Sequence, residues 1–350
     1  MGDKVFFLGA GFSKALDNNY PLLIGDNSLT TIVSEKIKAN NILYNHFDTI
    51  PKSIKNNIEH LFSYLTMDAP WKTEKQKHLD KALFIALTEL LTEYLFNLEK
   101  REKSGSKQNF DNLAKFIIDN KTPIITLNYD LLLENLLLNS PSNKDNNNWW
   151  ILGYRYLYKN LIDINDRMNP GGFVDGGTFG SEKLKEEKTT EILKLHGSIN
   201  WYYSGYSAID PVYYVDNLNE LDKDSIGDLV PYIIPPTLDK NSFYNNNILK
   251  LLWSKAHQYL RNAKEIYIIG FSFPMTDLPV RFLFQSALRG REKEVEIFVV
   301  NKEIPLSYKK IFDGFTNIHY EYCKDGNPLD AFLNGHLHKE EEATSVILSD

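Results

Sequence analysis

Short apolar runs alternate along this chain with longer stretches in which apolar residues recur every three or four positions. The runs have the length of buried strands and lie at 4–8, 122–127, 192–195, 265–269 and 294–300, with a weaker one near 317–322. A further strand is predicted where the chain leads into Pro235-Pro236. The longer stretches are typical of helices that bury one face, most clearly at 78–100. The alternation predicts an α/β fold, a Rossmann-like and mostly parallel sheet with helices on both faces.

The chain has 350 residues, which is enough to bury a full core, and we expect a single domain over 1–350. Helical periodicity without a strand pattern fills 28–108, so a large helical insertion should follow the first strand. Residues 139–190 are the least regular part and carry Asn-rich and Gly-rich stretches. A terminal helix is predicted near 328–340, and the charged segment 340–350 is expected to be a flexible tail.

Composition places the chain among ordinary globular proteins, with 43% hydrophobic and 24% charged residues. No apolar run approaches the roughly 18 residues of a membrane helix, and the early first strand leaves no room for a signal peptide, so a cytoplasmic protein is expected. The net charge of −7 and the scattered basic residues argue against direct nucleic-acid binding. The single cysteine, Cys323, excludes a cysteine-based zinc module, and no metal site is predicted.

Three polar clusters follow three of the apolar runs. They are Gly9-Ala10-Gly11-Phe12-Ser13, Asn128-Tyr129-Asp130 and His196-Gly197-Ser198. The carboxyl ends of parallel strands meet at one rim of a sheet, and open α/β sheets bind nucleotides there, so we expect the clusters to surround one ligand. Glycines in the first cluster would let backbone amides approach a pyrophosphate, with Ser13 capping the helix that follows.

Each cluster taken alone has a simpler structural explanation. The glycine-rich turn departs from the dinucleotide fingerprint at Lys14, where glycine or alanine is usual, and it fits a tight turn without a ligand. Asn128 and Asp130 fit helix caps, and His196 fits a buried histidine with satisfied hydrogen bonds. The three together favour a nucleotide-consuming enzyme, because they bring an amide, a carboxylate and an imidazole beside a phosphate site.

These clusters, followed by Gly270-Phe271-Ser272 and Val300-Asn301, occur in the order found in sirtuins, and the set spans 5–301. The chain thereby resembles the sirtuin fold and, most closely, the bacterial sirtuin-like NAD hydrolases of anti-phage defence. It lacks the four zinc cysteines and the Pro-Asp-Phe-Arg signature of sirtuin deacylases, and Tyr129 stands where those enzymes usually carry Ile or Val. The departures argue against protein deacylation and for retained chemistry on NAD.

The resemblance implies a zinc-free hydrolase that cleaves the nicotinamide–ribose bond of NAD to give nicotinamide and ADP-ribose. Asn128 and His196 would be the catalytic pair, with Asp130 supporting the site near nicotinamide. The cofactor-binding positions would be Gly9, Ala10, Gly11, Phe12 and Ser13 in the first turn, Gly270 and Ser272 near phosphate or ribose, and Asn301 near the adenosine ribose. Cleavage of this bond needs no strong general acid, because the leaving group departs neutral.

The resemblance also implies regulation, since an unrestrained NAD hydrolase would deplete its own cell. The catalytic domain and its insertion account for most of the chain, so the trigger is expected to be another polypeptide or the assembly state. A homo-oligomer is predicted, and the candidate partners are a HerA-type DNA translocase ATPase or an Argonaute-like protein. The helix at 78–100 and the terminal helix are candidate contact surfaces. Defence would proceed by abortive infection through NAD depletion.

Three other functions stay open. An NAD-dependent protein deacylase would need 139–230 to form an acyl-lysine groove without zinc. A sensor or assembly module would bind NAD and leave it intact. An esterase would use Ser272, whose surroundings resemble a nucleophile elbow, with His319 or His336 as its base. Asp277, which precedes the next predicted helix, is predicted to be a helix cap.

Overall fold

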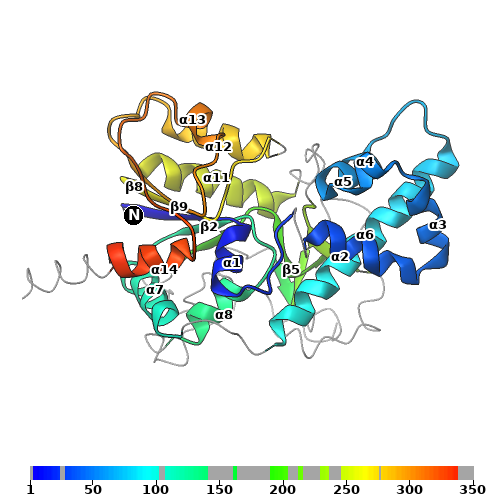
Figure 1. The fold of residues 1–350 in the computed structure, drawn as a ribbon, viewed down its shortest axis with the longest axis horizontal. Coiled ribbons are helices and arrows are strands. Elements are labelled where there is room, and N and C mark those ends of the chain that lie inside the picture. Colours follow the sequence, from blue (N-terminus) through cyan, green and yellow to red (C-terminus); the bar gives the residue numbers. More distant parts are fainter. Residues whose placement is uncertain are drawn as a thin grey trace, which may run out of the picture.

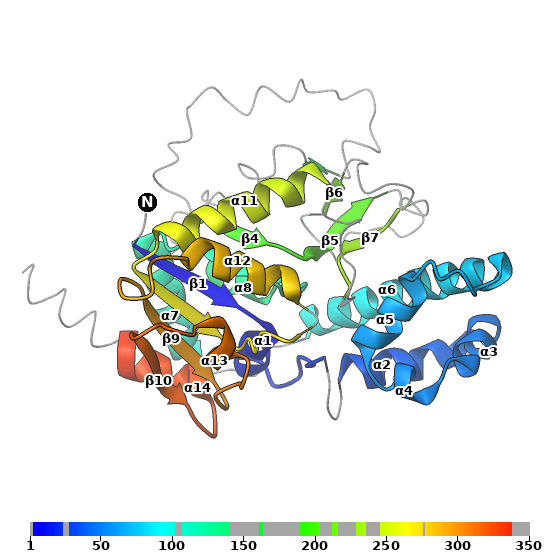
Figure 2. The same cartoon turned by 90° about the horizontal axis from the view of Figure 1, so that it is seen from above.

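A computed structural model describes residues 3–23, 28–101, 107–140, 161–163, 190–203, 212–215, 229–235, 246–275 and 277–337 (Figure 1). A six-stranded sheet forms the centre of the molecule, and the helices α2 to α6 extend to one side of it (Figure 2). No helix within these ranges is both long enough and apolar enough to cross a lipid bilayer.

The central sheet has the strand order β10-β9-β8-β1-β2-β4, and every neighbouring pair is parallel. Its strands are β1 (Lys4–Leu8), β2 (Ile124–Thr126), β4 (Ile192–Lys194), β8 (Glu265–Ile269), β9 (Glu296–Asn301) and β10 (Ile318–Cys323). Counted from β4, this is the Rossmann order 3-2-1-4-5-6, which confirms the predicted Rossmann-like α/β fold. The order reverses between β1 and β8, and open α/β sheets bind their ligands at such a switch point.

Helices cover both faces of this sheet. Successive residues of a strand point to opposite faces, so Phe6 and Leu8 of β1 enter one core while Val5 and Phe7 enter the other. The first core is shared with α1 (Ala10–Leu16), α7 (Lys107–Asn120), α8 (Leu132–Leu138) and α14 (Pro328–Phe332). The second is shared with α11 (Asn247–Asn262), α12 (Leu278–Leu288) and α13 (Tyr308–Ile311). Burial on both faces explains why the strands are unbroken apolar runs in the sequence.

The segment between β1 and β2 contains the helical insertion that the sequence predicts. Its elements are α2 (Leu29–Lys36), the 3-10 turn η1 (Ile37–Ala39), α3 (Asn41–Thr49), α4 (Lys52–Lys55), α5 (Ile58–Thr66) and α6 (Glu74–Glu99). The 26-residue α6 begins at a capping box, in which the side chains of Thr73 and Gln76 hydrogen-bond each other's backbone amides. Leu83, Leu87 and Leu91 are fully buried at a spacing of four residues, so the apolar face of α6 is core.

A second sheet has the order β3-β6-β5-β7. The sequence predicts one of its strands, the run that leads into Pro235-Pro236, but not the sheet itself. Its strands are β3 (Leu161–Asp163), β5 (Gly197–Tyr203), β6 (Val212–Tyr214) and β7 (Val230–Ile233). β5 pairs antiparallel with β6 and β7, and α6 packs against β5 and β7. β5 alternates polar and apolar residues over Ser198, Ile199, Asn200 and Trp201, but both kinds are buried along almost its whole length.

The C-terminal part differs from the prediction of one helix near 328–340. Helix α14 ends at Phe332 and is followed by a π turn, η7 (Leu333–Leu337). An Asn-Gly pair lies inside this turn, and both residues are poor helix formers. The predicted tail at 340–350 and most of the irregular segment 139–190 lie outside the described residues.

The first turn of α1 lies against the turn that follows β8, backbone to backbone. The Gly9 amide donates to the Ile269 carbonyl (3.0 Å), and the Gly11 amide donates to the Gly270 carbonyl (2.9 Å). A Cβ atom on Gly9 would lie 2.6 Å from the Gly270 oxygen, and one on Gly11 would lie 2.7 Å from the Gly270 Cα. Gly270 itself has φ +65°, and a Cβ there would lie 2.2 Å from the Phe12 nitrogen. Only glycine permits this approach at all three positions.

We expect Gly270→Ala to lower the free energy of unfolding by about 2–4 kcal/mol, because it adds a steric clash to a left-handed backbone. Gly290→Ala is the matched control, since Gly290 has φ +80° but nothing within 4 Å of its Cβ position. That control should lose about 1 kcal/mol from backbone strain alone. Urea denaturation measures both values, and equal losses would contradict the close contact.

Candidate functional site

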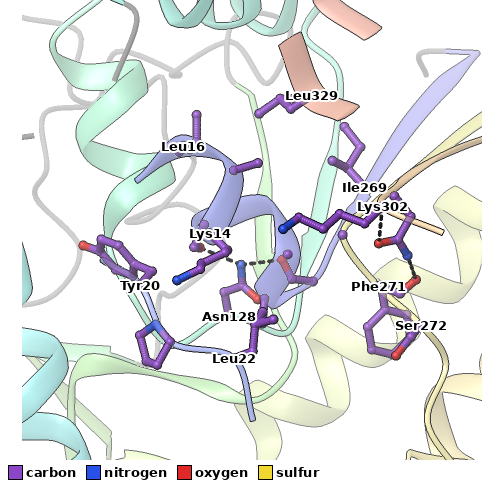
Figure 3. A pocket seen from close by; sticks show the side chains of 18 of the residues that line it. Lys14, Leu16, Tyr20, Leu22, Asn128, Ile269, Phe271, Ser272, Lys302 and Leu329 are labelled. Atoms are coloured by element: carbon purple, nitrogen blue, oxygen red, sulfur yellow. Dashed lines mark hydrogen bonds between the residues drawn. The ribbon is translucent and has the colours of Figure 1, made fainter. Parts of the chain in front are cut away.

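A cavity of about 990 Å³ opens at the carboxyl ends of the parallel strands, at the switch point of the sheet. Its volume is at the upper end of the roughly 300–1,000 Å³ that small-molecule sites occupy. The predicted site residues on its wall are Gly9, Ala10, Gly11, Ser13, Asn128, Asp130, His196, Gly270, Ser272 and Asn301. In Figure 3, Asn128 lies near Lys14 on one side of this cavity, and Phe271 and Ser272 lie on the other.

Phe12 is the predicted binding residue that the structure assigns to the core instead. Helix α1 begins at Ala10 with Gly9 as its N-cap, and position 12 then faces the sheet, where Phe12 is 1% exposed. The same helix start places Ser13 inside the helix, so its predicted role as a cap is wrong. The Phe12 amide donates to the Gly9 carbonyl (2.9 Å), and the amides of Gly9 and Gly11 are also committed to backbone carbonyls. The glycines of this turn therefore serve close packing against Gly270.

Ser13 joins the first two polar clusters. Its hydroxyl donates to Asp130 Oδ2 (2.8 Å) and accepts a hydrogen bond from Asn128 Nδ2 (2.9 Å). Asn128 Nδ2 also donates to the Gly9 carbonyl (3.0 Å). Both Nδ2 hydrogens of Asn128 are thus donated within the protein, which leaves Oδ1 as the atom that this side chain offers to a ligand, as an acceptor.

Asp130 is a buried carboxylate at the end of this hydrogen-bond chain. Its Oδ1 accepts from the Leu132 amide (3.1 Å) at the start of α8, so part of its predicted capping role is present. Burial raises the pKa of Asp130 to about 6, the Glu99 carboxylate adds to the rise, and Lys194 and the Ser13 hydrogen bond oppose it. At neutral pH the side chain is therefore mainly ionised and carries a negative charge beside the cavity.

A buried ion pair supports the loop that carries Asp130. Lys194, at the end of β4, is 1% exposed, and its ammonium lies 2.9 Å from Glu134 Oε1. The same ammonium donates to the Asp130 carbonyl. A fully buried lysine is tolerated only when it is paired. The sequence carried a signal for both residues, since each is a lone charge inside an apolar run.

The helical insertion reaches the same loop through Glu99, in the last turn of α6. Glu99 Oε1 accepts hydrogen bonds from the Tyr20 hydroxyl (2.6 Å) and the Leu131 amide (3.0 Å), and Oε2 accepts from the Asn135 amide group (2.9 Å). A glutamate at a helix C-terminus is unfavourable for the helix dipole, so its presence there was a signal of a specific contact. Burial and the Glu99 carboxylate raise the pKa of Tyr20 far above its usual range.

His196 lies on the cavity wall at the end of β4 and is 4% exposed. The Ile234 amide donates to its carbonyl (2.8 Å), and its ring centroid lies 6.4 Å from that of Trp253. Asp277 Oδ1 lies 3.9 Å from His196 Nε2. Asp277 occupies the N-cap position of α12, but its side chain makes no capping hydrogen bond. Its predicted position as a helix cap is therefore confirmed, but the predicted capping hydrogen bond of its side chain is not formed.

Asn301, at the end of β9, links the two connections that follow β8 and β9. Its Nδ2 donates to the Phe271 carbonyl (3.2 Å), and its Oδ1 accepts from the Lys302 amide (3.1 Å). Ser272 is exposed on the same side of the cavity. Asn301 thus holds the wall in place, and the solvent-facing Ser272 hydroxyl remains a candidate contact for a ligand.

The two histidines considered as partners of Ser272 pack elsewhere. The ring centroids of His319 and His336 lie 4.5 Å and 4.6 Å from that of Phe298, a residue in the middle of β9. Within the described part of the chain, the histidine that lines the cavity together with Ser272 is His196. The structure therefore does not assemble the esterase site.

No protein-family model matches this chain, and no curated protein matches it. Similar solved structures include an ADP-ribose complex of a mutant Sir2 homologue, with 14% identity and a TM-score of 0.47 over 97% of this chain and 93% of that one. A Sir2 homologue–NAD complex has 14% identity and a TM-score of 0.46, over 96% and 90%. A Sir2–p53 peptide–NAD⁺ complex has 11% identity and a TM-score of 0.42, over 97% and 93%. The fold assignment itself rests on the strand order of the six-stranded sheet.

The raised pKa of Asp130 predicts a pH dependence of stability. Between the ordinary aspartate pKa of 3.8 and the folded-state pKa of about 6, the folded protein keeps a proton that the unfolded chain releases. Stability from this group is therefore present at low pH and is lost as pH rises through 6. Relative to Asp130→Asn, the wild-type free energy of unfolding should fall by about 2 kcal/mol between pH 4.5 and 7.5. Urea denaturation of both proteins across this range tests it, and parallel pH curves would contradict it.

The buried ion pair predicts non-additive losses of stability. Lys194→Met should lower the free energy of unfolding by about 3–5 kcal/mol, because it leaves the Glu134 carboxylate buried without its cation. The double variant Lys194→Met/Glu134→Leu should lose less than Lys194→Met alone. Thermal and urea unfolding of the two single variants and the double variant give the comparison. A double variant less stable than Lys194→Met would disprove the pairing.

Proposed function

We propose that this protein is an NAD hydrolase that cleaves the bond between nicotinamide and ribose, releasing nicotinamide and ADP-ribose. The observation that carries the proposal is the convergence of Ser13, Asn128, Asp130 and His196 on one cavity at the switch point of the sheet. These residues are far apart in the sequence. Roles as separate caps or core residues would not require them to share a cavity.

The chemistry suits a site of this composition. The nicotinamide ring of NAD is cationic and leaves neutral, so bond breaking needs no strong acid, and positive charge develops on the ribose ring. A fixed negative charge near that ring stabilises the transition state. Asp130, whose pKa of about 6 leaves it mainly ionised at neutral pH, is the candidate for this role. Asn128 Oδ1 is oriented by the two hydrogen bonds of Nδ2, and it would accept a hydrogen bond from a ribose hydroxyl or the attacking water.

His196 is the proposed base. Water that attacks the anomeric carbon must lose a proton as the new C–O bond forms, and imidazole exchanges protons near neutral pH more readily than other side chains. The cavity wall presents His196 from β4 and Asn128 from the adjacent β2, so one sugar ring can contact both. Capture of the ribosyl cation by water gives linear ADP-ribose.

We further propose that the enzyme depletes NAD in anti-phage defence after activation by a partner protein, such as a HerA-type ATPase or an Argonaute-like protein. The support for a controllable site is the Glu99 contact. It joins the end of α6 to the Leu131 amide, one residue from Asp130, so a change in α6 would move the loop that carries two site residues. A partner or a second copy bound on the insertion would therefore act on the site directly.

Replacing Asn128 or His196 by Ala should lower NAD cleavage by about 100-fold or more, because each change removes a hydrogen-bonding or proton-accepting group from the reacting ribose. Chromatography of NAD incubated with the full-length protein measures nicotinamide and ADP-ribose. Asn139→Ala and His60→Ala are the controls, since they remove the same side chains from exposed positions. Both controls should keep wild-type activity.

The assay also separates the alternative functions. If the wild-type protein alone does not cleave NAD, the assay is repeated with each candidate partner protein. Undiminished cleavage by both Ala variants would overturn the assigned roles. NAD that binds stoichiometrically but is recovered intact, with every partner present, would favour a sensor module, and ADP-ribose linked to acyl transfer from an acylated peptide would favour deacylation.

A further inference from the structure

We propose that Asp277 is a positioning residue that acts through His196, orienting its imidazole and stabilising the ring when it is protonated. The inference rests on the proposed function for its role in catalysis, but the pair itself is a structural feature. His196 Nε2 and Asp277 Oδ1 lie 3.9 Å apart on the wall of one cavity. His196 and Asp277 are 4% and 7% exposed, so water screens their interaction weakly.

The course of the chain after β8 brings Asp277 to His196. His196 follows the edge strand β4 and Asp277 follows β8, and β1 and β2 lie between those two strands. Three strand spacings amount to about 14 Å, so the connection after β8 must run along the rim of the sheet to reach His196. It is anchored on the way by Phe273, which is fully buried against Phe7 and Phe284.

Backbone strain accompanies this path. Phe273 has φ +50°, one of two positive φ values among the non-glycine residues of the described chain. A bulky residue adopts that conformation only where its surroundings impose it. The aromatic contacts of Phe273 supply that constraint, and the consequence is that Asp277 arrives at the cavity wall. Helix capping does not account for the direction of the carboxylate, because the Asp277 side chain makes no capping hydrogen bond at the start of α12.

Two other charged side chains near His196 are held by partners of their own. Asp130, after the neighbouring strand β2, is engaged by the Ser13 hydroxyl and the Leu132 amide. Lys194, two residues before His196 on β4, points to Glu134 and the Asp130 carbonyl. Glu59 lines the same cavity from α5 in the insertion. A carboxylate at 3.9 Å favours the protonated imidazole over the neutral one.

The pair completes the proton balance of the proposed reaction. As the C–N bond to nicotinamide breaks, its electron pair leaves with the neutral base, and the water oxygen bonds to the anomeric carbon. The proton lost by that water moves to His196, which becomes cationic. Asp277 stabilises the imidazolium without itself taking the proton, and the proton is released to solvent when the product leaves.

NMR titration of the His196 ring in the full-length protein, labelled with ¹³C in its histidines, tests the pair without reference to turnover. The midpoint of that titration should fall by about one pH unit in Asp277→Asn and stay near the wild-type value in Asp277→Glu. Asp313→Asn, which removes an exposed carboxylate outside the cavity, is the control and should leave the midpoint unchanged. An unchanged midpoint in a folded Asp277→Asn variant would overturn the proposal.

Kinetics then separate a role through His196 from a structural one. Asp277→Asn should lower kcat about 10–100-fold with little change in KM, and the double variant Asp277→Asn/His196→Ala should be no slower than His196→Ala alone. Equal multiplicative losses in the double variant would contradict action through His196. If the His196 midpoint shifts in Asp277→Asn but the wild-type protein does not cleave NAD, the result would support the His196–Asp277 pair and refute the proposed function. If Asp277→Asn does not fold, Asp277→Ser takes its place once thermal unfolding shows that it is folded, and its midpoint should fall in the same way.

Discussion

The backbone contact between the β1–α1 turn and the connection after β8 is the constraint on which the site depends. In this sheet the chain leaves β1 toward one face and β8 toward the other, so the two connections meet only at the rim. Gly9, Gly11 and Gly270 bring them together through amide–carbonyl hydrogen bonds. A Cβ atom at any of these positions would clash with the backbone of the other connection. Asn128 is placed against this contact, because its side chain donates to the Gly9 carbonyl.

The polar groups of the site are held by one another rather than by solvent. Ser13 joins Asn128 to Asp130, and Lys194 with Glu134 supports the same loop from within the sheet. Buried charges of this kind are unfavourable unless each has a partner, so the network holds the loop in one conformation. The Glu99 carboxylate adds to the raised pKa of Asp130, and Glu99 also joins this loop to the helical insertion through the Leu131 amide. The insertion is therefore part of the site's support and not only an attached bundle.

Charged side chains of both signs line the cavity. Lys14 lies beside the glycine turn and Lys302 beside the end of β9 (Figure 3), and the acidic residues Glu303, Asp325 and Asp330 line the same wall. Asp130 and Asp277 line it near Asn128 and His196, where a cation would form during the cleavage of a nicotinamide–ribose bond. An NAD molecule carries both features, a pyrophosphate and a cationic ring. The two lysines and the two aspartates would suit these two parts of the proposed substrate.

Local pattern determined much of this protein. Apolar runs identified all six strands of the parallel sheet, and apolar residues every three or four positions identified α6. Polar clusters at strand ends predicted that Asn128, Asp130 and His196 share one rim of the sheet. These signals depend on near neighbours in the chain. Of the second sheet the sequence predicted only the strand that leads into Pro235-Pro236, because the pairing of β5 with β6 and β7 depends on residues that are not neighbours in the chain. Tertiary structure alone decided that Phe12 is core, that Ser13 is not a cap, and that Asp277 lies near His196 without a capping hydrogen bond. Those outcomes depend on which way a helix turns its residues and on how strands are ordered across a sheet, and no local run of residues contains that information.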